Sequence, residues 1–140
     1  MTNPAFPSLS IRQVLVALAA FLFVGSVQAE WISLGRTDNF RVYLEQNQLR
    51  RNGDVVQTWQ LMDFTSAQWV DERAVVGSIK NLTEYDCSQP RFRTLLVEAY
   101  SEQMAEGRLV AKEQLPDPPW EGVEAGGTAE KIWRAACGKK

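Results

Sequence analysis

The apolar segment Val14–Val24 near the start of the chain decides in which compartment the rest folds, and so whether its cysteines can be oxidised. Arg12 is the only charged side chain before it, and the small-residue sequence Val27-Gln28-Ala29 follows it. This order is typical of a signal peptide and its cleavage site. We therefore predict that residues 1–29 are removed, that the mature chain begins at Glu30, and that it folds in an oxidising compartment.

An uncleaved membrane anchor is the alternative to a signal peptide. The apolar segment has about half of the ~20 residues that span a bilayer, and a small-residue site follows it at once, so we expect cleavage. The absence of a cysteine near this site argues against an acylated lipoprotein. We predict an exported, periplasmic protein with no stable membrane anchor after cleavage. A location at the cell surface or secretion is the alternative.

The predicted mature part, residues 30–140, has the length of one domain and is mildly acidic. All 17 acidic residues lie in it, together with all but one of the 15 Lys and Arg. Nucleic acid is not an expected partner, because phosphate binding needs a basic field. The chain contains no His and so lacks the usual general base and the commonest metal ligand. We predict no metal and no cofactor.

Cys87 and Cys137 are the only cysteines. Without His or further thiols a metal site is not expected, and the pair lacks the Cys-x-x-Cys spacing of redox-active thiols, which remain the alternative. In an exported domain two thiols most simply form one structural disulfide. By the chain-entropy model a bond that closes a loop of about fifty residues stabilises the fold by roughly 4 kcal/mol.

Alternation of apolar and polar residues predicts an antiparallel sheet. Phe40, Val42 and Leu44 share one face of the clearest strand. A hairpin is expected at Arg51-Asn52-Gly53-Asp54, since Asn-Gly readily adopts positive φ. The expected strands are residues 31–36, 39–46, 55–64, 74–87, 91–100 and 108–113, and residues 65–73 are expected to be a connection.

Two of the expected strands also indicate features of the sheet. The apolar phase over residues 74–87 is imperfect, because Ile79 and Leu82 fall on opposite faces; this indicates a bulge or two partly covered faces. Residues 91–100 are apolar on both faces, which is typical of a central strand. We therefore expect neighbours on both sides of that strand.

The segment Leu115–Gly122 contains three prolines and cannot be regular structure. We expect an extended crossover with Trp120 inserted in the core; a polyproline ligand for an aromatic groove is the alternative. A helix should follow, with Thr128 as its N-cap, and should end near Cys137 at Gly138. The predicted fold class is α+β, a five- to six-stranded antiparallel sheet with a C-terminal helix packed on one face and held by the disulfide.

One set of residues stands out by its order along the chain: Trp31, Gly53, Val56, Trp59, Glu84-Tyr85-Asp86-Cys87, Tyr100, Gly107, Trp120 and Ala135-Ala136-Cys137. Their order and spacing resemble the surface-adhesin protein E-like family of Gram-negative bacteria. The resemblance covers nearly all of residues 31–137 and implies a six-stranded antiparallel sheet with a helix attached by the disulfide. It further implies binding of host matrix and serum proteins, such as vitronectin and laminin, and a link to haem.

The basic residues suggest one candidate binding surface. Arg91 and Arg93 alternate on one strand face, and Arg50 and Arg51 flank the predicted hairpin turn. Together they suggest a basic patch for an acidic partner such as a glycoprotein or polysaccharide. Solvated strand faces are the alternative, in which Glu84 and Asp86 pair with the arginines across strands.

Three aromatic residues are further candidates. Trp69 lies in the expected connection and is the aromatic residue most open to contact with a partner, with core burial as the alternative. Tyr85 and Tyr100 have the side chain of a haem-iron ligand, but packing is the favoured role for both. Paired carboxylates for acid–base catalysis would need a cleft that nothing in the sequence predicts.

The function predicted from these features is a non-enzymatic, exported binding module that contacts a protein or glycan through a sheet face or a loop. The alternative is a periplasmic structural or accessory protein of the cell envelope without a host ligand. The expected partner is a host matrix protein or an envelope protein. Formation of a homodimer through an uncovered strand edge is a further hypothesis.

Overall fold

The computed structural model describes residue 2 and residues 29–139. The predicted signal peptide lies almost entirely outside these described residues, so its removal stays a prediction. All structural statements below concern the described part of the chain.

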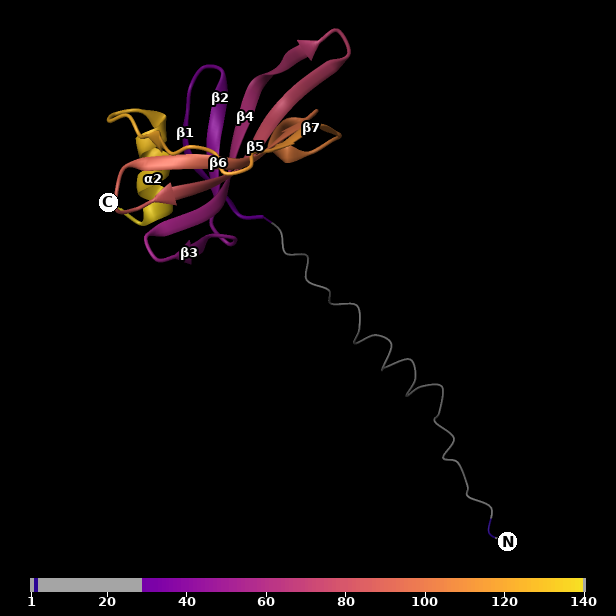
Figure 1. The fold of residues 1–140 in the computed structure, drawn as a ribbon. Helices are drawn as coiled ribbons and strands as arrows, with labels where there is room; N and C mark the ends of the chain where they lie inside the picture. Colours follow the sequence, from indigo (N-terminus) through magenta and orange to yellow (C-terminus); the bar gives the residue numbers. More distant parts are fainter. Residues whose placement is uncertain (1, 3–28, 140) are drawn as a thin grey trace.

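The described chain forms one antiparallel sheet of eight strands with a single α-helix against one face (Figure 1). The strands lie in the order β1-β2-β4-β5-β6-β7, while β3 pairs with β4 and β8 pairs with β6. The bounds are β1 Trp31–Arg36, β2 Phe40–Glu45, β3 Arg50–Asn52, β4 Val55–Asp71, β5 Ala74–Asp86, β6 Arg91–Tyr100, β7 Leu109–Gln114 and β8 Glu121–Gly122.

The predicted antiparallel sheet is confirmed, but the expected number of five to six strands is too low. The two additional strands are β3 and β8, which have three and two residues. Segments this short show no alternation from which a strand can be recognised. The expected hairpin is present between β3 and β4, with Asn52 opposite Val55 and Gly53 at a φ of 60° in the turn.

The hairpin of β4 and β5 is longer than predicted, and the expected connection over residues 65–73 is wrong. Strand β4 continues to Asp71 and pairs with β5 out to Ala74. Strand β2 accompanies β4 only as far as Phe64, and β6 accompanies β5 only as far as Ser78. Residues 65–77 therefore form a two-stranded arm, which projects beyond the rest of the sheet (Figure 1).

One further expectation about the sheet is confirmed and one is resolved. The register between β5 and β6 shifts between Leu82 and Thr83, but the extra residue is Leu95 of β6, so the bulge is not in β5. Strand β5 pairs with β4 without a shift from Ser78 to Asp86, so Ile79 and Leu82 lie on opposite faces, as in the alternative of two partly covered faces. Strand β6 pairs with β5 on one side and with β7 and β8 on the other, so it is a central strand.

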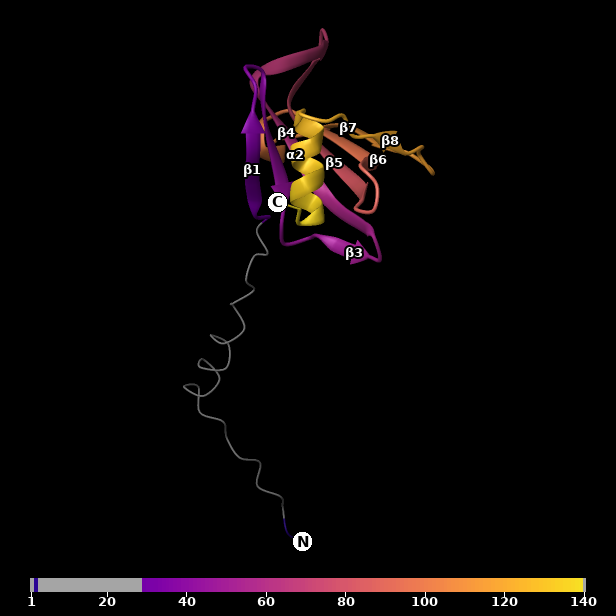
Figure 2. The same ribbon diagram turned by 90° about the vertical axis from the view of Figure 1, so that its left-hand side faces the viewer.

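Helix α2, Thr128–Cys137, packs against β1, β4 and β5 (Figure 2). Its N-cap is Gly127 rather than the predicted Thr128, and no side chain caps it. Instead the carboxylate of Glu130 accepts a hydrogen bond from the backbone N–H of Gly126 at 2.6 Å. The helix ends as expected at Gly138, whose φ of 66° is the left-handed conformation that glycine adopts without a Cβ clash.

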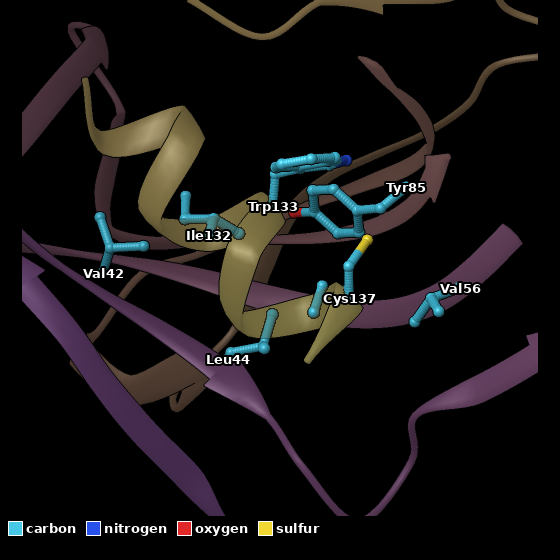
Figure 3. Close-up of a cluster of buried hydrophobic side chains, with 8 residues drawn as sticks. Val42, Leu44, Val56, Tyr85, Ile132, Trp133 and Cys137 are labelled. Atoms are coloured by element: carbon cyan, nitrogen blue, oxygen red, sulfur yellow. The ribbon is translucent and has the colours of Figure 1, made fainter. Parts of the chain in front are cut away.

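The core lies between this helix and the sheet (Figure 3). Ile132 and Trp133 point from the helix toward the strands, where Val42 and Leu44 come from β2. The predicted disulfide between Cys87 and Cys137 is present, with 5.5 Å between the two Cα atoms. We call this side of the sheet the helix face and the opposite side the far face. The core consists of Val42, Leu44, Val56, Tyr85, Ile132, Trp133, Ala136 and Cys137.

Candidate binding surfaces

The strand register places two of the predicted arginines in one row across the sheet. Arg50 lies opposite Gln57, Gln57 opposite Glu84, and Glu84 opposite Arg93. Residues directly opposite one another in a sheet share a face, and this row lies on the far face, since the neighbouring row through Tyr85 belongs to the core. Arg50 and Arg93 line one shallow hollow together with Arg51, Asn52, Val55, Gln57 and Glu84.

The arginines of β6 form ion pairs with carboxylates across the strands, which is the alternative to a basic patch that the sequence offered. Arg91 binds Asp86 at 2.8 Å, and Arg93 binds Glu84 at 2.7 Å and Asp117 at 3.3 Å. The hydroxyl of Ser88, its N–H and the Arg91 guanidinium hold the pKa of Asp86 at about 2, against the opposing effect of burial. The positive charge on this strand is therefore compensated within the domain.

Trp120 lies over these two arginines and not in the core, where it was expected. Its ring is 4.9 Å from the guanidinium carbon of Arg91 and 4.6 Å from that of Arg93. The side chain is half-buried. Cation–π contacts of this kind stabilise by roughly 0.5–1 kcal/mol at exposed sites. The proline-rich crossover thus runs along the edge of β6 between β7 and β8, and the arginines of β6 hold its Trp120 over the far face.

The remaining two arginines lie on different sides of the sheet. Arg51 reaches toward the helix, where its Nη2 atom is 3.5 Å from the carbonyl oxygen of Cys137. Arg50 is exposed and forms no ion pair with any residue that the structure describes. The four predicted arginines therefore do not form one continuous basic patch; Arg91 and Arg93 are paired with carboxylates, whereas Arg50 and Arg51 lie on opposite faces and form no ion pair with a described residue.

The tip of the arm carries the two most exposed large apolar side chains of the described chain. Trp69 is 71% exposed and Val70 is 66% exposed. Both lie next to the turn, where the carboxylate of Asp71 accepts a hydrogen bond from the N–H of Arg73 at 2.7 Å. The side chain of Trp69 is therefore exposed to solvent and does not lie in the core. Its backbone belongs to a paired strand and not to a loop.

The base of the arm is held by the turn between β6 and β7, through contacts that the sequence did not reveal. The short 3-10 turn η1, Gln103–Ala105, includes Met104 at a φ of 58°. The carboxylate of Asp63 accepts a hydrogen bond from the N–H of Met104 at 2.7 Å, and the hydroxyl of Ser78 donates to the carbonyl of Glu102 at 2.6 Å. Asp63 and Ser78 are both buried. These contacts anchor the point at which the arm leaves the sheet.

A small apolar cavity of about 200 Å³ lies between the sheet and the first turn of α2. Burial raises the pKa of the Tyr85 hydroxyl, which donates a hydrogen bond to Gln60 at 2.7 Å in the cavity wall. Tyr100 donates to Glu98 at 3.0 Å. Both tyrosines are engaged in packing and hydrogen bonding. The other residues that line the cavity are Phe40, Val42, Leu61, Met62, Phe92, Thr128, Ala129 and Ile132.

The lining of this cavity contains no carboxylate, and the described residues hold no group of three or more His, Cys, Asp or Glu side chains that could bind a metal. No helix in the described part of the chain is long and apolar enough to cross a membrane. The features that the structure brings to the surface are an exposed aromatic tip and a far face crossed by paired charges.

These features define a small α+β domain with one disulfide-held helix and surfaces suited to binding. The chain belongs to the surface-adhesin protein E family, whose family model matches residues 31–138. Membership implies a surface or exported protein and an adhesin-like binding module.

Solved structures with the same fold come from Haemophilus influenzae. One crystal form of its protein E has a TM-score of 0.61 at 12% identity, over 80% of this chain and 90% of that one. Protein E from a non-typeable strain has a TM-score of 0.61 at 13% identity, over 81% of this chain and 79% of that one. At this level of identity the likeness concerns the fold. No curated protein sequence matches the chain.

Proposed function

We propose that this protein is an exported, non-enzymatic binding module that contacts a protein partner through the tip of its arm. The observation that carries the proposal is the exposure of Trp69 and Val70, at 71% and 66%, on the paired arm. Tryptophan is enriched among the residues that dominate binding energy at protein interfaces. A large aromatic side chain in solvent contributes nothing to the core and is available to a partner.

The position of the arm supports this role. It extends beyond the sheet (Figure 1), so a partner can approach it without displacing α2 or the proline-rich crossover. Bonds from η1 to Asp63 and Ser78 anchor the base of the arm, and these limit the freedom that would be lost on binding. Family membership favours a host protein as the partner.

The arginine surface is the less favoured contact. Arg91 and Arg93 are each bound to a carboxylate and lie under the Trp120 ring, so they are not free to bind an anion. Of the four arginines, Arg50 offers a charge on the far face without a carboxylate partner among the described residues. A single exposed guanidinium gives weak, salt-dependent attraction, which can help orient a partner but does not select one.

Binding of the exported protein to immobilised matrix proteins and glycans tests the proposal. We expect Trp69→Ala to weaken binding to the recognised partner by at least about tenfold. Leu109→Ala is the matched control, because Leu109 is an exposed apolar residue on β7, outside the arm. Equal affinities of the Trp69→Ala variant and the unchanged protein would rule out the arm as the contact.

Protease treatment of intact cells separates the proposal from its alternative, a periplasmic accessory protein without a host ligand. We expect surface protease to remove the protein. Full protection, together with no binding to any matrix protein, would favour the accessory role.

A further inference from the structure

Glu45, at the end of β2, is a buried carboxylate with an incomplete set of partners. The residue is only 1% exposed. One oxygen, Oε1, accepts hydrogen bonds from the backbone N–H groups of Glu30 at 3.1 Å and Asn47 at 3.0 Å. The other oxygen, Oε2, is buried and has no partner among the described residues. Leaving a charged oxygen in this state is costly, so its environment points to a missing donor.

One of the two nitrogens that donate to this carboxylate belongs to the residue at which the predicted mature chain begins. Trp31 lies opposite Glu45 in the register of β1 and β2, and the carbonyl of Glu30 accepts a hydrogen bond from the N–H of Gln46 at 3.3 Å. These contacts fix the backbone of Glu30 beside the Glu45 carboxylate. In the uncleaved chain this nitrogen is an amide with a single hydrogen, which is already used by Oε1.

We propose that Glu45 is the binding site for the α-ammonium group that signal peptidase creates on Glu30. Hydrolysis adds water across the Ala29–Glu30 amide: the hydroxyl goes to the carbonyl carbon of Ala29 and the hydrogen to the nitrogen of Glu30. The new amine takes a further proton from solvent, because α-amino groups have a pKa of about 7.7–8.0. It then carries a positive charge and three donors.

This ammonium supplies what the buried carboxylate lacks. It can keep its hydrogen bond to Oε1 and offer a second one to Oε2, and it balances the negative charge with a geometry already set by the β1–β2 pairing. The domain is therefore completed by removal of its signal peptide. The inference depends on the predicted cleavage site and is independent of the proposed role of the arm.

The test uses protein exported from the full precursor. One form is the unchanged chain; a second has two serines inserted between Ala29 and Glu30, so that Glu30 keeps an amide after cleavage. Each form is made with Glu45 intact and with Glu45→Gln. Intact mass checks that the unchanged chain begins at Glu30; a different start would overturn the inference.

Thermal unfolding is the first measurement. We expect the serine insertion to lower the Tm by about 4 °C or more when Glu45 is intact, and by less than about 1 °C in the Glu45→Gln background. Glu113→Gln is the control, since Glu113 is exposed on β7, and the effect of the insertion should persist in it. Equal shifts in the Glu45 and Glu45→Gln backgrounds, or no shift in either, would contradict the inference.

Amine labelling gives an answer that does not depend on whether the Glu45→Gln variant folds. A succinimidyl ester at neutral pH reacts with free α-amines, and peptide masses locate the label. We expect the terminal amine of the unchanged chain to react about tenfold more slowly than the terminal serine of the inserted chain, because an ion pair holds it protonated. Equal rates would show that the amine of Glu30 is free in solution.

Discussion

Trp133 donates its indole N–H to the backbone carbonyl of Asp86 at 2.7 Å, one residue before the disulfide-bonded Cys87. The helix is thus fixed to the end of β5 by two adjacent attachments, one covalent and one a buried hydrogen bond. The flat ring of Trp133 also belongs to the core (Figure 3). This point of attachment sets the position of α2 on the sheet.

Replacing Trp133 with phenylalanine tests the hydrogen bond. The change keeps an aromatic ring but leaves the Asp86 carbonyl without its partner, so we expect a loss of about 1–3 kcal/mol in the free energy of unfolding. Urea denaturation measures it. The control is Trp69→Phe at the exposed arm tip, for which a change within about 0.5 kcal/mol is expected; similar losses for both would argue against a special role of the bond.

Removal of the disulfide should be more damaging. We expect the double change Cys87→Ser and Cys137→Ser to lower the free energy of unfolding by about 2–5 kcal/mol, because the unfolded chain regains the freedom of a long loop. Denaturation curves with and without reductant measure this. The reductant should destabilise the unchanged protein by a similar amount and leave the double variant unaffected.

The low pKa of Asp86 predicts a loss of stability in acid. The carboxyl has a pKa of about 2 in the folded protein, against 3.8 ordinarily, so the folded state favours the charged form. Its contribution is fully present above about pH 4 and is lost as the pH falls toward 2, because the unfolded state binds the proton first. Over this range the free energy of unfolding should depend less steeply on pH in the Asp86→Asn variant than in the unchanged protein. Asp38→Asn, in an exposed turn, should keep the original slope.

Gly77 should not tolerate alanine. A Cβ atom there would lie 2.5 Å from the backbone carbon of Glu102, so η1 would have to move away from the base of the arm. We expect a loss of about 1–3 kcal/mol and faster proteolysis within residues 65–77. Gly122→Ala is a matched control, since nothing lies within 4 Å of the atom it would add. Equal stability of the two variants would contradict this close approach.

The sequence predicted elements well where one face of a strand is buried. Phe40, Val42 and Leu44 alternate because their side chains face α2 and the core, and the central place of β6 was visible because apolar residues occupy both of its faces. The disulfide followed from two cysteines and an exported chain. In these cases the buried face of the strand produces a regular spacing of apolar residues that can be recognised in the sequence.

The missed features lack such a pattern. Residues 65–71 are exposed on both faces, so β4 shows no alternation where it enters the arm. Trp120 is apolar enough for a core, but two cations on the far face hold it instead. The burial of Glu45 involves the backbone of Glu30, fifteen residues earlier, which local sequence does not reveal.

The separation of 50 residues between Cys87 and Cys137 also sets an order of events. A chain that crosses a membrane with its amino end first delivers every strand before the helix that carries Cys137. Until that helix emerges, the Cys87 thiol has no partner within the chain, and no helix can cover the core face of the strands. During that interval the incomplete domain is exposed to oxidants and to other chains, and arrival of the last element ends it by closing the bond.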